Sequence, residues 1–189
     1  MADPGPRPRR VRSDALRNRE RLLTAADEIF TVGGANAPLE HVAKQAGVGI
    51  GTLYGHFPSR RALIAALLAE RNEDLFEHGD RLLDAPATIE TLAAWIRAVV
   101  RHAATYQGLA EALVESLEDD GSELHASCLR MNSIGEELVQ RAVRSTALGP
   151  HATSADVFTL INAAAWTREH AGPEPADRLI FLVLNALQA

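Results

Sequence analysis

Side chains that can donate hydrogen bonds recur at every second position of one short segment of this 189-residue chain. Thr52, Tyr54 and His56 each carry a group that can contact a phosphate oxygen or the edge of a base. Three glycines lie among them, although a glycine within a helix costs about 0.5–1 kcal/mol relative to alanine. This cost is understandable where the backbone must approach a partner closely. We interpret the segment as a surface for DNA; the alternative is a loop with a few packed aromatic side chains.

The residues that precede these donors have the pattern of a helix-turn-helix. The first helix has an apolar stripe at the spacing i, i+3, i+4, i+7, formed by Leu39, Val42, Ala43 and Ala46. Gly47 follows at a helix end, where a positive φ is favoured. A second helix is expected over residues 49–56, before Pro58. Two helices joined by a tight turn leave the second one free to lie in a major groove.

The sequence LEHVAKQAGVGIGTLYGHFPSRRALI resembles the DNA-binding signature of the TetR-like (tetracycline-repressor-type, TetR/AcrR) transcriptional regulators. The specific similarity runs from about Leu16 to Leu68, and the remainder is similar to the family in length and helical pattern. The resemblance implies a homodimer that binds a double-stranded DNA operator through this motif. It also implies a small-molecule ligand in the C-terminal part and dimer contacts through the last two long helices.

The resemblance assigns further roles and shows two departures from the family. A helix that begins at Ser59 is expected to meet the DNA backbone, with Arg60 at a usually basic position. Asn36 is expected to cap the second helix in place of the usual Ser or Thr, and Gly55 replaces a bulkier residue. The candidate DNA-binding residues are Gly49, Ile50, Gly51, Thr52, Tyr54, Gly55, His56, Ser59 and Arg60.

Charge is distributed unevenly along the chain. The net charge is −6, which alone would argue against a nucleic acid as partner. However, residues 1–60 contain nine Lys and Arg against six Asp and Glu, whereas residues 61–189 contain ten against nineteen. A basic first third on an acidic remainder indicates a protein that docks one end onto a polyanion.

Helical periodicity without strand patterns predicts an all-α fold of about nine helices. We expect residues 1–12 to form a disordered basic arm, which either contacts DNA or only solubilises the chain. Residues 13–58 are expected to form a three-helix helix-turn-helix DNA-binding domain that opens at Ser13. Residues 59–189 are expected to form a helical ligand-binding and dimerisation domain.

Enzyme signatures are absent from the sequence, so we predict no catalytic residues, no metal and no cofactor. Cys128 is the single cysteine and is expected to be a small buried hydrophobe. No apolar run approaches the roughly 18–20 residues of a membrane span, and the N-terminus lacks a signal-peptide pattern, so we expect a cytoplasmic protein that does not enter a membrane.

Large side chains of the C-terminal part are candidates for a ligand pocket, although each one alone is more typical of a core. They are Phe76, Trp95, His102, Tyr106, Met131, Phe158 and Trp166. The last helix, LIFLVLNAL, is apolar nearly all round, which favours a subunit interface over a central core helix. The candidate interface residues are Phe158, Ile161, Leu179, Leu182, Val183 and Leu187.

These patterns together predict a sequence-specific transcriptional regulator, a repressor that a small molecule releases from a pseudo-palindromic operator. An activator remains open, as do a helical enzyme or ligand carrier and a helix-turn-helix used for protein contact. The glycine-rich second helix and the basic first third disfavour the last of these.

Overall fold

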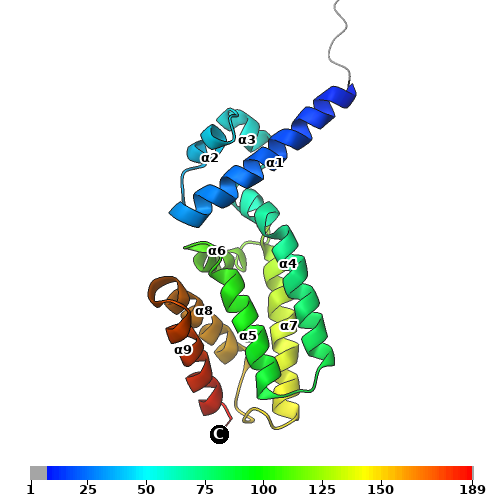
Figure 1. Cartoon of the computed structure of the whole chain (residues 1–189). Helices are drawn as coiled ribbons and strands as arrows, with labels where there is room; N and C mark the ends of the chain where they lie inside the picture. Colours follow the sequence, from blue (N-terminus) through cyan, green and yellow to red (C-terminus); the bar gives the residue numbers. More distant parts are fainter. Residues whose placement is uncertain (1–7, 189) are drawn as a thin grey trace, which may run out of the picture.

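The computed structural model describes residues 8–188, and the part of the chain that it describes contains nine α-helices and no strand. In chain order the helices are α1 (Pro8–Gly33), α2 (Leu39–Gln45), α3 (Ile50–His56), α4 (Arg60–Asp84), α5 (Ile89–Ala103), α6 (Leu109–Ser116), α7 (His125–Arg144), α8 (Ser154–Ala171) and α9 (Pro173–Ala186). Figure 1 shows α1–α3, here called the head, above a body of α4–α9. The predicted all-α class and number of helices are confirmed.

The head is built around one apolar centre. Leu22 and Phe30 of α1, Val42 of α2 and Leu53 of α3 are each 0% exposed. The predicted turn between α2 and α3 is present, because Gly47 has φ +64 and the N–H of Val48 donates to Ala43 O at 3.0 Å. The positive φ is what favours glycine here, because the nearest atom to a Cβ at residue 47 would be the flexible end of Arg21, Nη2 at 2.6 Å.

Two predicted helix starts differ from the structure. Helix α1 begins at Pro8 rather than at Ser13, since proline is tolerated in the first turn and the following Arg-rich residues continue the helix. The expected disordered arm therefore loses residues 8–12, and residues 1–7 lie outside the described part. Asn36 does not cap α2, because the N-cap position belongs to Pro38 and has no side-chain cap.

Helix α4 joins the head to the body. Ser59 caps it by accepting the N–H of Ala62 at 2.9 Å, and its 25 residues span about 37 Å at 1.5 Å per residue. The helix packs against α1 in the head and against α5 and α7 in the body (Figure 1). It passes so close to its neighbours that a Cβ at Gly79 would lie 2.8 Å from Cζ3 of Trp95.

Helix α5 lies at the centre of the body and packs against α4, α7, α8 and α9 (Figure 1). This position explains why nine of its fifteen residues are buried, including Trp95 and Ile96 at 0% exposure. Helices α8 and α9 form an antiparallel pair on one side of the body, joined at Gly172 with φ +91. The cap of α8 is a reciprocal pair, in which Asp156 N donates to Thr153 Oγ1 and Thr153 N donates to Asp156 Oδ2.

Candidate nucleic-acid interface and ligand cavity

Helix α3 presents one face to the core and the other to solvent. Leu53 is fully buried and Phe57 is 3% exposed, whereas Tyr54 is 48% and Ile50 is 37% exposed. Thr52 is exposed, and His56 is half-buried beside Phe57, with 6.3 Å between ring centroids. The side chains predicted to read bases therefore lie on the outer side of the head.

The three glycines of this segment are not required by packing inside the protein. A Cβ built at Gly49, Gly51 or Gly55 would meet no atom within 4 Å, and all three residues are exposed. Packing within the chain would therefore allow a larger side chain at each of these three positions. It leaves the outer backbone of α3 accessible to an external surface.

The side chains of Ser59 and Arg60 make hydrogen bonds within the protein. The Ser59 hydroxyl caps α4 and also donates to the carboxylate of Glu123, with 3.2 Å between the oxygens. The guanidinium of Arg60 donates to the carbonyls of Ala35 at 2.8 Å and Ala37 at 2.6 Å. These bonds hold the loop before α2, and the predicted phosphate contact of Arg60 stays a prediction.

Two exposed basic residues of the head, on α1 and α2, were not among the candidates. The guanidinium carbon of Arg19 lies 5.4 Å from the centroid of the Phe57 ring, at the end of α3, and its side chain is exposed. Lys44 is exposed on α2. In the sequence, Arg19 is one of several arginines on a helix face, and only the position of Phe57 distinguishes it from its neighbours.

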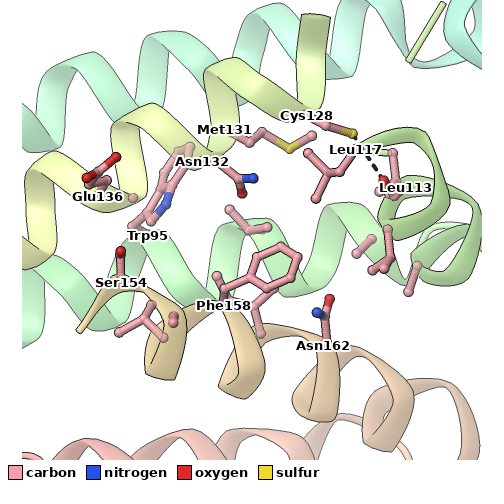
Figure 2. Close-up of a pocket in the computed structure, with 18 residues that line it drawn as sticks. Trp95, Leu113, Leu117, Cys128, Met131, Asn132, Glu136, Ser154, Phe158 and Asn162 are labelled. Atoms are coloured by element: carbon pink, nitrogen blue, oxygen red, sulfur yellow. Dashed lines mark hydrogen bonds between the residues drawn. The ribbon is translucent and has the colours of Figure 1, made fainter. Parts of the chain in front are cut away.

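The body contains a cavity of about 350 Å³ between α5, α6, α7 and α8. Its lining consists of Trp95, Val99, Ala103, Ala110, Leu113, Val114, Leu117, Cys128, Met131, Asn132, Gly135, Glu136, Ser154, Ala155, Val157, Phe158, Ile161 and Asn162. Figure 2 shows Met131 and Asn132 of α7 and Phe158 of α8 directed into the same space. Three of the seven predicted ligand-binding residues, Trp95, Met131 and Phe158, thus line one cavity.

The other four candidates lie elsewhere. Phe76 is 4% exposed beneath the guanidinium of Arg130, which is 4.2 Å from the ring centroid. Trp166 is 62% exposed and stacks on His170, with 4.3 Å between the centroids. It borders a second, more open cavity of about 780 Å³ between the start of the α1–α2 loop, α6 and α8.

Two further candidates, His102 and Tyr106, belong to packing near the head. His102 is 7% exposed, and burial, followed by the charge of Arg71, lowers its pKa to about 4. The hydroxyl of Tyr106 donates to Asp27 of α1 at 2.5 Å, and burial together with this bond raises the pKa of Tyr106. Size alone selected these residues from the sequence, and size does not distinguish a core side chain from a cavity wall.

The polar residues of the cavity were not identified from the sequence, because nothing in their local pattern distinguishes them. Asn132 and Glu136 on α7 and Asn162 on α8 line it, although each is an unremarkable polar residue in a helical sequence. Cys128 also borders the cavity; it is 4% exposed, as expected for a small hydrophobe, and burial raises the pKa of its thiol.

Apolar side chains are exposed on the outer side of α8 and α9. Trp166, Phe181 and Leu182 are 62%, 60% and 54% exposed. Of the predicted interface residues, Leu182 therefore lies outermost, and Ile161, Leu179, Val183 and Leu187 are half-buried against the body. Phe158 lines the cavity instead. Phe181 was not among the candidates, because in an all-apolar helix the sequence does not show which side faces the core.

Among the side chains that the structure describes, those of residues 14–188, no group of three or more His, Cys, Asp and Glu is arranged to hold a metal ion. No helix in that range combines the length and the apolar character that crossing a bilayer requires.

Family models match both parts of the chain. A model described as "Bacterial regulatory proteins, tetR family" matches residues 22–67, which span most of the head and the start of α4. A model described as "Transcriptional regulator SbtR-like, C-terminal domain" matches residues 86–189, more than half of the chain.

The chain is also similar to individual regulators. The crystal structure of the TetR transcriptional regulator SCO0520 from Streptomyces coelicolor is 33% identical, covers 89% of this chain and 97% of that chain, and has a TM-score of 0.59. The FadR of Bacillus subtilis in complex with stearoyl-CoA is 22% identical, with coverages of 90% and 97% and a TM-score of 0.60, and shares the fold. The HTH-type regulator SrpR of Pseudomonas putida is 35% identical over 68 residues, which are 35% of this chain.

Curated relatives such as SrpR are matched over a limited segment, between 32% and 51% of their own length in the first three. The C-terminal family model and the SCO0520 structure extend the similarity over the body as well. With a helix-turn-helix whose second helix faces outward, these matches show that the chain belongs to the TetR family of bacterial transcriptional regulators.

Proposed function

We propose that this regulator is a homodimeric repressor whose two α3 helices read successive major grooves of an operator, about 34–36 Å apart or a multiple of it. The observation that carries the proposal is the outer face of α3, where exposed Thr52 and Tyr54 accompany glycines with open space above them. Base contacts are assigned to Ile50, Thr52, Tyr54 and His56. We infer phosphate contacts for Tyr54 and His56, for the N–H groups at the start of α3, and for Arg19 and Lys44 on the basic head.

The dimer is proposed to form through α8 and α9. Three large apolar side chains on this pair, Trp166, Phe181 and Leu182, are more than half exposed. Large apolar side chains that remain exposed on one helix pair are typical of an interface. Two copies of the helix pair, related by a two-fold axis, would form a four-helix bundle and fix the spacing of the two heads.

Helix α6 provides a route from the cavity to the DNA-binding head. Leu113 and Leu117 on one side of this region line the cavity. On its other side Glu115 and Asp119 accept hydrogen bonds from Arg61 of α4, at 3.1 and 2.6 Å. A ligand that displaces α6 would therefore also displace the start of α4, which carries the head. Such a ligand favours dimers with mis-spaced heads and lowers the population that can bind the operator.

We propose residues 13–58 as the DNA-binding unit and residues 59–189 as the ligand-binding and dimerisation unit. The contacts of α4 with α1 on one side and with α5 and α7 on the other support α4 as the helix that links the two units. Transcriptional regulators are a non-enzymatic class, and we propose no catalysis for this one. Its site of action would be the cytoplasm, where a bacterial operator lies. Reporter transcription with and without the protein would distinguish a repressor from an activator.

The test is fluorescence anisotropy of the purified protein with DNA from upstream of its own gene, titrated with salt beside a scrambled duplex. We expect saturable binding selective for the upstream DNA, with a log–log slope of about −0.9 for each phosphate neutralised. Size-exclusion chromatography with light scattering, on the wild type and on Phe181→Glu, tests the dimer. If neither upstream DNA nor any fragment from a genomic selection binds above the scrambled control, the proposed function is wrong.

A further inference from the structure

We propose that the cavity among α5–α8 selects a small apolar amine in its protonated form, with the ammonium group at Glu136 and the apolar part between Trp95, Met131 and Phe158. This inference rests on the proposed function, in which the same cavity holds the ligand that controls DNA binding. It adds the chemical class of that ligand.

The charge of the cavity wall is the first argument. Among the described residues that line it, Glu136 carries the single formal charge, and neither lysine nor arginine is present. A carboxylate or phosphate in this space would lose water without gaining a cationic partner, which is strongly unfavourable. The stearoyl-CoA bound by the FadR of Bacillus subtilis carries phosphates, for which the lining of this cavity offers no cation.

The carboxylate of Glu136 is available to a ligand. One oxygen accepts a hydrogen bond from Gln140 at 3.3 Å, and no basic side chain among residues 14–188 pairs with it. Arg144 borders a neighbouring depression together with Glu136, but its guanidinium donates to Glu137 at 3.0 Å. Since Glu136 is exposed, it lies where a cation can reach it from solvent.

The remaining wall suits an aromatic or alicyclic group. Residue 135 is glycine, and a Cβ there would lie 3.1 Å from Nε1 of Trp95, so the α7 backbone packs closely against the indole at the cavity wall. Met131 and Phe158 lie on the walls formed by α7 and α8 (Figure 2). The volume of about 350 Å³ is near the lower end of the range of about 300–1,000 Å³ for small-molecule sites, which indicates a small ligand.

Three probes of one shape test the selection: 1-naphthylmethylamine, 1-naphthalenemethanol and 1-naphthoate, which are cationic, neutral and anionic at pH 7. The full-length protein carries Trp166→Phe, so that the tryptophan emission comes from Trp95, the remaining one of the two tryptophans. We expect quenching of Trp95 with the amine bound about twofold to fivefold more tightly than the alcohol, as for an exposed ion pair. The naphthoate should bind more than about tenfold more weakly than the amine.

The variant Glu136→Gln should abolish the preference for the amine over the alcohol while the affinity for the alcohol is retained. Glu137→Gln is the matched control, because it removes the same charge from the next residue, which does not line the cavity. Equal or tighter binding of naphthoate, an unchanged preference in Glu136→Gln, or no response of Trp95 to any probe would each overturn the inference. The readout needs no DNA, so failure of operator binding with a normal Trp95 response would count against the proposed function alone.

Discussion

The outer face of α3 and the cavity of the body are both surfaces for a partner, but they are built in opposite ways. The face consists of residues within one seven-residue helix, and its glycines face open space. The cavity is assembled from four helices between Trp95 and Asn162. Two glycines pack against the indole of Trp95: Gly135, which lines the cavity, and Gly79 of α4. A glycine on the face is therefore free to change as far as folding is concerned, whereas a glycine at the cavity is held by packing.

The largest expected effect is on stability and comes from overpacking at Gly79, next to Trp95 of the cavity. Gly79→Val would place a Cβ 2.8 Å from Trp95 and 2.9 Å from Ile134, so α4 must move away from α5 and α7. We expect a loss of about 3 kcal/mol in the free energy of unfolding, at the upper end of the cost of overpacking. Urea denaturation followed by circular dichroism measures it. A loss below about 0.5 kcal/mol, the usual range for surface substitutions, would show that the helices separate easily.

The next effect concerns the face alone. Tyr54→Ala removes a half-exposed ring from α3, and we expect affinity for the operator to fall about tenfold to a hundredfold, corresponding to roughly 1–3 kcal/mol for a good base contact. The urea midpoint should stay unchanged. Anisotropy and denaturation on the same preparation check both statements. Unfolding of the head instead would mean that Tyr54 supports the core.

A pH titration examines the buried interior outside both regions, at His102 of α5. The pKa of His102 is lowered from 6.5 to about 4, so below pH 6.5 the unfolded chain binds a proton that the folded chain does not. Stability is therefore lost as pH falls, by about 2 kcal/mol between pH 7.5 and pH 5 from this group. His102→Asn should lack this contribution. If both proteins lose the same stability over that range, His102 does not keep its neutral form.

The smallest change sharpens the comparison most. Gly51→Ala adds a methyl group where no atom lies within 4 Å, so the free energy of unfolding should rise by about 0.5–1 kcal/mol, as for glycine to alanine in a helix. Operator affinity should nevertheless fall, because the methyl group occupies space that we assign to DNA. Urea denaturation measures the change in the free energy of unfolding, and fluorescence anisotropy measures the change in operator affinity. A more stable protein with unchanged affinity would refute the close approach at this position.

Local pattern was sufficient for the head. The stripe from Leu39 to Ala46, the positive φ at Gly47 and the outward donors of α3 follow from spacing within a few residues, and the structure has the helices and turn where they were expected. The start of α1 was placed five residues too late, because proline was taken as a breaker although it is compatible with a first turn. The phosphate contact of Arg60, assigned by family position, stays a prediction. Its bonds to two carbonyls could not be predicted from the sequence, because only the folded loop brings those carbonyls near it.

By itself, the sequence determined the helical class, the helix-turn-helix and the outward face of α3, since these depend on neighbours at i+3 and i+4. Only the tertiary structure decided which large residues border the cavity. Trp95, Met131 and Phe158 meet there, while Phe76 and His102 fill the core, and Glu136 becomes the charge at the cavity. It also decided that Phe181 faces outward. The physical reason is that a cavity and an interface depend on distances between helices far apart in the chain, and periodicity along one helix contains no such distances.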